Sequence, residues 1–117
     1  MQRSRNNSFG LRVQDNANLT VKNSISSGNA FAGFSVVQVA GGPVALTLDA
    51  SVASSNGTFG LVANGNGTTI ARITNSTFTN NATGMQAQGT SQIVSAGNNF
   101  ISGNNPDGAP TSTPGQQ

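Results

Sequence analysis

The chain of 117 residues contains no cysteine, histidine, tryptophan or tyrosine. Without cysteine it forms neither disulfide bonds nor thiolate nucleophiles. Without histidine it lacks the imidazole that activates most serine nucleophiles, and the absence of both residues removes the usual zinc ligands. The many serines and threonines are therefore interpreted as strand and turn residues. We expect no catalytic residue, no cofactor or cofactor-binding residue, and no metal site.

Charged residues are also few, with five cations and three carboxylates giving a net charge of +2. A nucleic-acid surface needs clustered cations and is helped by exposed aromatic rings. The cations are instead spread along the sequence, at Arg3, Arg5, Arg12, Lys22 and Arg72. We therefore expect no nucleic-acid partner, although the isoelectric point is about 10.7.

Long hydrophobic runs are missing as well. No stretch approaches the length of a membrane span, so we expect none. The first residues, Met1–Asn7, carry cations, but no apolar region follows them, so this segment does not have the pattern of a signal peptide. The compartment is left open by the sequence.

Acidic residues are limited to Asp15, Asp49 and Asp107, and no two of them are close in the sequence. Neither a paired-carboxylate glycosidase nor a calcium-assisted lyase is therefore visible. Asp15 and Asp49 would meet only if non-equivalent faces of the fold converged. We place Asp107 in a Pro-Asp-Gly turn, and we expect Asp49 to form a surface pair of small value with Lys22.

What the chain does have is a repeat of about 24 residues that recurs four times. Each copy has apolar residues at alternate positions, then an Asn or Ser, a further apolar residue, a second Asn and a Gly. A period of this length is typical of stacked units. The copies are Leu19–Gly33, Leu46–Gly60, Ala71–Gly84 and Val94–Gly108.

The alternation within each copy predicts short strands that turn one face inward. No segment has a sustained helical period, and Gly, Asn, Ser and Thr fill the connections. Strands joined by bends at a fixed period predict a parallel β-helix of about four to five coils. An antiparallel β-sandwich is the alternative, but hairpins need no fixed period. The inward pairs expected are Leu19 and Val21, Leu46 and Leu48, Ala71 and Ile73, and Val94 and Ala96, followed by a stack of Ile25, Val52, Phe78 and Phe100.

Two columns of identical residues should accompany the stacked coils. Asn tolerates the left-handed region at a bend, and stacked amides can bond one another up the column. Glycine is expected where a Cβ would clash. We interpret both columns as structural: Asn29, Asn56, Asn81 and Asn104 in one, and Gly10, Gly33, Gly60, Gly84 and Gly108 in the other.

Two further patterns are interpreted without a functional role. The segment Asn64-Gly65-Asn66-Gly67 lacks the lysine and the helix of a phosphate-binding loop, so it is interpreted as an ordinary loop. Thr20 and Thr47 should stack, as in an ice-binding array, but Arg72 takes the next equivalent position and ends the array.

The stretches Asn75–Gly84 and Gly97–Gly108 resemble right-handed parallel β-helix repeat proteins of bacteria, which are pectin-lyase-like in fold. The resemblance covers roughly residues 9 to 110. The last part of this range resembles the C-terminal segment of largely uncharacterised members of the family. It implies an all-β, right-handed parallel β-helix over residues 9–108, with a flexible leader at 1–8 and a mobile tail at 109–117. The enzymes of that family use carboxylates, often with calcium, plus Arg or Lys on one outer face, and this sequence departs from that pattern.

For function, the sequence favours a non-catalytic structural or binding module. The resemblance implies a piece of an exported or cell-surface protein. Open coil ends predict self-association into a homo-oligomer, and the polar outer faces allow a saccharide or protein partner. The alternative is a polysaccharide-acting lyase or glycoside hydrolase.

Overall fold

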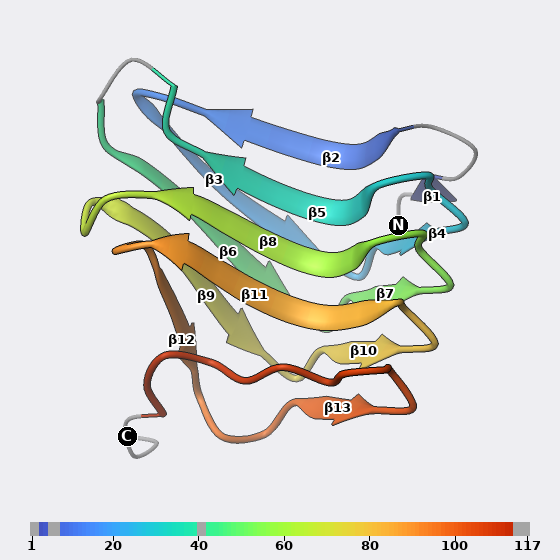
Figure 1. Ribbon diagram of the computed structural model, residues 1–117. Coiled ribbons are helices and arrows are strands. Elements are labelled where there is room, and N and C mark those ends of the chain that lie inside the picture. Colours follow the sequence, from blue (N-terminus) through green and yellow to red (C-terminus); the bar gives the residue numbers. More distant parts are fainter. Residues whose placement is uncertain (1–2, 5–7, 40–41, 114–117) are drawn as a thin grey trace.

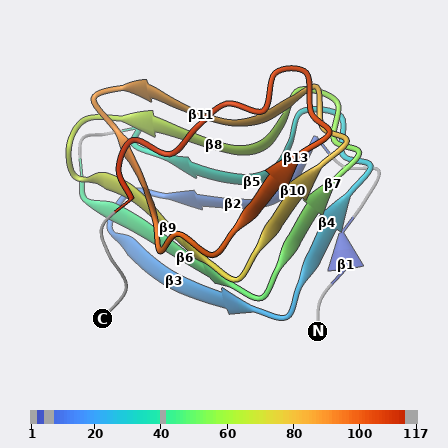
Figure 2. The same cartoon turned by 90° about the horizontal axis from the view of Figure 1, so that it is seen from below.

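The computed structural model describes residues 3–4, 8–39 and 42–113, and this part of the chain is all-β. It contains thirteen strands in three parallel sheets and no helix. Successive strands pass from one sheet to the next, and each circuit lies beside the preceding one (Figures 1 and 2). The protein is therefore a parallel β-solenoid of about four turns, as predicted, and the antiparallel alternative is excluded.

The three sheets run along the stack, and successive coils add one strand to each, so that sheet A has five strands and the other two have four. Sheet A has the order β1 (Arg3–Ser4), β4 (Ile25–Ser27), β7 (Val52–Ser54), β10 (Thr77–Thr79) and β13 (Phe100–Ser102). Sheet B contains β2 (Phe9–Gln14), β5 (Ala32–Val37), β8 (Phe59–Gly65) and β11 (Thr83–Gly89). Sheet C contains β3 (Ala17–Lys22), β6 (Val44–Asp49), β9 (Thr69–Thr74) and β12 (Gln92–Ser95).

Sheet C shows how the alternation of the sequence becomes a core. In β6, Val44, Leu46 and Leu48 are buried, and the residues between them are partly exposed. The register places Leu46 between Leu19 and Ala71, which confirms the predicted stacking of those inward positions. Buried apolar side chains from all three sheets then form one continuous cluster inside the coil.

The inward stack predicted for sheet A was wrong by one residue in three of its four coils. Phe78 is buried, but it lies beside Ala53 and Ile101, and Ala53 lies beside Ser26. The inner positions of these two coils hold small residues, and both are buried. The other three residues of the predicted stack, Ile25, Val52 and Phe100, therefore point outward, and Phe100 is 59% exposed.

The same one-residue error occurs in the last coil of sheet C. Ile93 and Ser95 pair with Ala71 and Ile73 and are buried. The predicted inward pair of Val94 and Ala96 is thus displaced by one position. Val94 instead continues the outer column of Thr20, Thr47 and Arg72, whose register was predicted correctly.

The bend from sheet A to sheet B explains the glycine column. A Cβ added to Gly60 would lie 2.6 Å from the carbonyl oxygen of Gly84 and 2.7 Å from Nδ2 of Asn81. Gly10, Gly33 and Gly84 meet equivalent obstacles, so close approach of the next coil requires glycine, as predicted. Asp107, rather than the expected Gly108, lies opposite Gly84 and completes this column.

The two ends of the stack differ. At the C-terminal end, backbone oxygens of Pro106 and Asp107 accept bonds from Gly84 and Met85 on β11, and Ser112 pairs in parallel with Val94 on β12. This segment runs along the last coil in Figure 1. At the other end, no strand among the described residues pairs with the outer edge of β2 or β3.

Candidate functional site

The three carboxylates lie apart, and two of them accept hydrogen bonds from the protein. Asp15 precedes β3, whereas Asp49 lies opposite Lys22 at the far end of that strand. The length of β3 therefore separates the two by roughly 16 Å or more, at about 3.3 Å per residue. Both carboxylate oxygens of Asp15 accept from the backbone N–H of Val39, at 2.9 and 3.0 Å.

Lys22 and Asp49 are neighbours in the register, as predicted. Across the described residues, however, no ion pair joins their side chains, so the predicted surface pair is wrong although the positions are right. No cluster of three or more acidic, histidine or cysteine residues able to hold a metal occurs in the part of the chain that the structure describes.

The Asn column is a continuous hydrogen-bonded ladder. Nδ2 of Asn29 donates to Oδ1 of Asn56 at 2.9 Å, Asn56 donates to Asn81 at 2.8 Å, and Asn81 donates to Asn104 at 3.0 Å. Each acceptor oxygen also receives the backbone N–H of the preceding Asn. The prediction of stacked, structural amides is confirmed.

The prediction that these asparagines adopt the left-handed backbone conformation was wrong. None of the four has a positive φ. The left-handed conformation falls instead on the preceding residue: Gly28, Ser55, Asn80 and Gly103. The conformation of the preceding residue therefore positions each ladder amide, and the asparagine itself contributes its side-chain hydrogen bonds.

Asp107 ends the ladder. Its Oδ1 accepts from the backbone N–H of Asn104 at 2.9 Å and from Nδ2 of Asn104 at 3.0 Å. A carboxylate oxygen thus takes the place of the next amide oxygen. Asp107 was predicted only to lie in a turn. Its three-residue spacing from the last ladder Asn could have suggested this role.

A second ladder, of hydroxyl groups, was missed. At the bend from sheet C to sheet A, the backbone N–H of Ser24 donates to Oγ of Ser51, and that of Ser51 donates to Oγ of Ser76. Oδ1 of Asn99 accepts from Ser76 in turn. Each serine follows a residue of positive φ, namely Asn23, Ala50 or Asn75.

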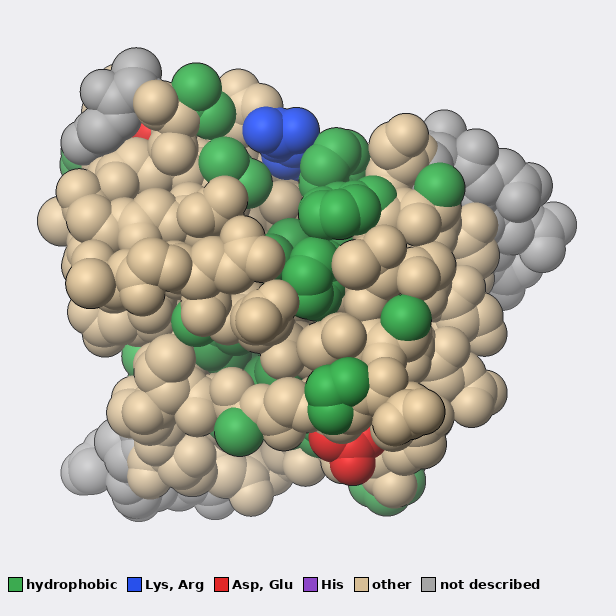
Figure 3. Space-filling view, in the orientation of Figure 1, with side chains coloured by type: hydrophobic (Ala, Val, Ile, Leu, Met, Phe, Trp, Pro, Cys, Tyr) green, Lys and Arg blue, Asp and Glu red, His purple; other side chains and the backbone are tan. Residues whose placement is uncertain are grey.

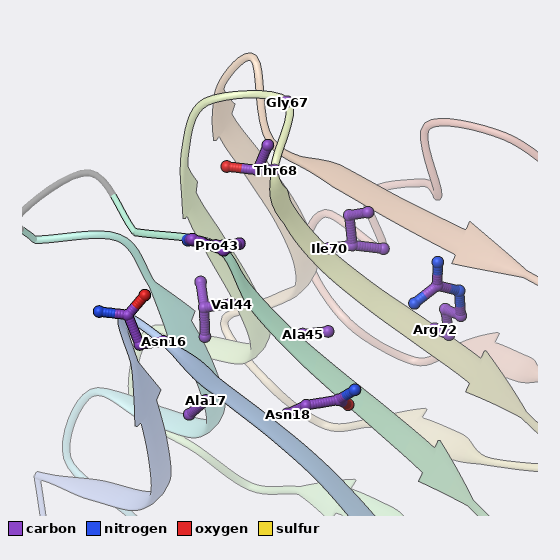
Figure 4. A pocket seen from close by; sticks show the side chains of 10 residues that line it. All are labelled: Asn16, Ala17, Asn18, Pro43, Val44, Ala45, Gly67, Thr68, Ile70 and Arg72. Carbon is purple, nitrogen blue, oxygen red and sulfur yellow. The ribbon is translucent and has the colours of Figure 1, made fainter.

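The outer face of sheet C carries the larger hollow, with a volume of about 600 Å³. It forms because Ala45 is small and lies between Asn18 and Ile70 on the neighbouring strands. Figure 4 shows this gap, with Pro43 and Thr68 at one end and Arg72 further along β9. The surface is shallow and poor in charge, and apolar residues such as Pro43, Ala45 and Ile70 form much of it.

The outer face of sheet B carries a smaller hollow beside a column of phenylalanines. The rings of Phe9 and Phe31 are 5.2 Å apart, and those of Phe31 and Phe59 are 5.4 Å apart, both edge to face. The guanidinium of Arg12 lies 4.8 Å from the centre of the Phe9 ring. Figure 3 shows hydrophobic side chains running down this face with a cationic side chain beside them.

The segment Asn64-Gly65-Asn66-Gly67 is a strand end followed by a tight turn. Asn64 and Gly65 belong to β8, and Oδ1 of Asn66 accepts from the backbone and hydroxyl of Thr68. Its polar groups are used within the turn, which agrees with the structural interpretation.

No protein-family model, curated protein or solved structure matches this chain. Its class is defined by its own architecture, a parallel β-solenoid with a buried Asn ladder. The described residues include no helix that could cross a membrane.

Proposed function

We propose that the chain is a non-catalytic structural or binding module that associates with a second copy through the N-terminal end of its solenoid. The separation of the three carboxylates supports the proposal that the chain is non-catalytic. Asp15 holds a backbone amide, Asp107 ends the ladder, and Asp49 lies at the far end of sheet C from Asp15. A glycosidase needs two carboxyl groups within about 10 Å of each other.

The fold and the repeat support membership of the right-handed, pectin-lyase-like β-helix proteins, with a place in an exported or surface protein. The separation of its three carboxylates distinguishes this chain from the enzymes of that class.

The self-association proposal rests on Leu19. This side chain occupies an inward position on β3, yet it is 39% exposed, whereas Leu46 and Ala71 below it are fully buried. Leu11 and Val21 of the same coil are also only partly buried and border a small gap of about 30 Å³. Apolar inward residues and strand edges exposed together favour pairing with another stack.

Sedimentation of the purified chain over a range of concentrations tests this proposal. Leu19→Lys should shift the dimer to monomer, because it places a charge at the coil end. Thr47→Lys, which adds the same charge on the outer face in mid-stack, is the matched control and should leave the dimer intact. A wild-type chain that stays monomeric at the highest concentration would refute the association, and thermal unfolding of both variants would show that they fold.

The outer face of sheet C is the surface proposed for binding, with a neutral saccharide as the occupant. The amides of Asn16 and Asn18 offer uncharged hydrogen-bonding groups along the hollow. Among the described residues that line it, only Arg72 is charged. An extended polar chain could lie across several coils there.

Incubation with a panel of polysaccharides, with and without calcium, separates binding from catalysis. We expect retention of at least one glycan without any change in its length, and weaker retention by Asn18→Ala. Turnover that disappears in Asp15→Ala or Asp49→Ala would establish the enzymatic alternative instead. Retention of no glycan would remove the saccharide as the occupant.

A further inference from the structure

The outer face of sheet B has a hollow of its own, distinct from the hollow on sheet C. It has a volume of about 150 Å³. Register explains its shape: on this face Ser35 lies between Arg12 and Val62, so a small side chain separates two larger ones. Phe31 borders one side, and Asn64 and Gln88 border the other.

The single charge at this hollow is held in place. Arg12 is exposed, but its guanidinium lies over the Phe9 ring at 4.8 Å, an arrangement that favours the cation and restricts the side chain. The Phe9 ring is in turn packed edge to face against Phe31. No carboxylate is among the described residues that line the hollow, so the cation is available to an anion.

Ser35 supplies an independent observation. The residue is fully buried, and its hydroxyl oxygen has no hydrogen-bond partner among the described residues. Buried polar groups in native proteins are nearly always paired, because an unpaired one costs about 1–3 kcal/mol. This hydroxyl is also closed to solvent, so an acceptor in the hollow would reach it once the side chains that cover it move aside.

We propose that this hollow binds a small organic monocarboxylate with a flat, apolar body. The carboxylate would accept from the Arg12 guanidinium, whose planar donors match it, and from the Ser35 hydroxyl. The apolar body would lie against Phe31 and Val62. The Asn64 and Gln88 amides would lie at the rim of the hollow.

The volume limits the size of the ligand. Drug-sized ligands occupy about 300–1,000 Å³, so a hollow of about 150 Å³ takes a molecule of roughly one ring. An inorganic anion such as phosphate would use the cation but leave the phenylalanine and valine walls without a partner. The combination of charge and apolar surface therefore favours an organic acid.

Titration of the full chain with benzoate, followed by NMR or calorimetry, tests the proposal. Benzamide has the same shape without the charge, and inorganic phosphate has charge without the apolar body. We expect benzoate to bind at least tenfold more tightly than either. Benzamide or phosphate binding as tightly as benzoate would overturn the proposal, as would absence of benzoate binding.

Two variants locate the site. Arg12→Gln should weaken benzoate binding at least tenfold, whereas Arg72→Gln, on the outer face of sheet C, should leave it unchanged. Ser35→Ala should also weaken binding several-fold while leaving thermal stability equal or higher, because it removes an unpaired buried hydroxyl. Benzoate binding that is unaffected by Arg12→Gln and Ser35→Ala would refute the site.

Discussion

At the scale of single residues, the buried asparagines contribute more through their side chains than through their backbone. Nδ2 of Asn56 donates to both Asn81 and the carbonyl of Ser26, and its Oδ1 accepts two bonds from Asn29. The amide thus serves the coil before it and the coil after it. The recurrence of Asn made this ladder predictable. The serine ladder was not, because serine is too common here for one column to stand out.

Removing one rung tests the ladder. Asn56→Ala should lower the free energy of unfolding by roughly 2–4 kcal/mol, because buried groups of Asn29 and Asn81 lose their partners. Urea unfolding measures the change. Asn18→Ala, which truncates an exposed Asn on the outer face of sheet C, is the control and should cost less than about 0.5 kcal/mol. Equal effects of the two substitutions would contradict a structural role for the ladder.

The end of the ladder can be tested separately. Asp107→Asn keeps an acceptor oxygen for Asn104 and should change stability little. Asp107→Ala removes the acceptor of two bonds and should cost about 1–3 kcal/mol. Thermal unfolding of the two variants side by side would show the difference, and a harmless alanine would mean that the carboxylate is dispensable.

At the scale of strands and bends, the sequence predicted the spacing of equivalent positions better than it predicted which side chains face the core. The glycine column and the register of β3, β6 and β9 were predictable because the repeats are long and alternating. Sheet A was not, because its strands β4, β7 and β10 have only three residues each. Ser26 and Ala53 are too small to reveal that they face the core, and the outer hollows depend on such small side chains.

Glycine in the bend should be required for the coil spacing. Gly60→Ala would place a Cβ 2.6 Å from the backbone oxygen of Gly84, so the two coils must separate. We expect a loss of about 2–4 kcal/mol or failure to fold. Gly67→Ala is the matched control, because the nearest atom to its added Cβ is 4.0 Å away. Comparable stability of both variants by urea unfolding would show that the bend can yield.

At the scale of the whole molecule, stability is shared among equivalent coils. Each coil contacts its neighbours through three parallel sheets and two side-chain ladders. In such quasi-one-dimensional proteins, stability is approximately a sum of unit and interface contributions. The period of the repeat was sufficient to predict this architecture, whereas the covering of one end by residues 104–113 was not visible in the sequence.

Deletion of one coil tests the equivalence. Removing residues 57–81 takes out 25 residues, the spacing of Asn56 and Asn81, and joins equivalent positions. The shortened chain should still give the circular dichroism of β-structure, with a denaturant slope lower by about a quarter. Deleting residues 57–68 instead joins non-equivalent positions and should abolish cooperative unfolding. Loss of folding in the full-coil deletion alone would show that the coils are not interchangeable.

The ladder also gives the molecule a polarity. Every amide in it donates in the same direction, and the column terminates at a side chain that has no hydrogen to pass on. Engineered fusions that extend the spiral beyond Asp107 would therefore meet an acceptor where they need a donor. Restoring an amide there would be the first step in any such extension.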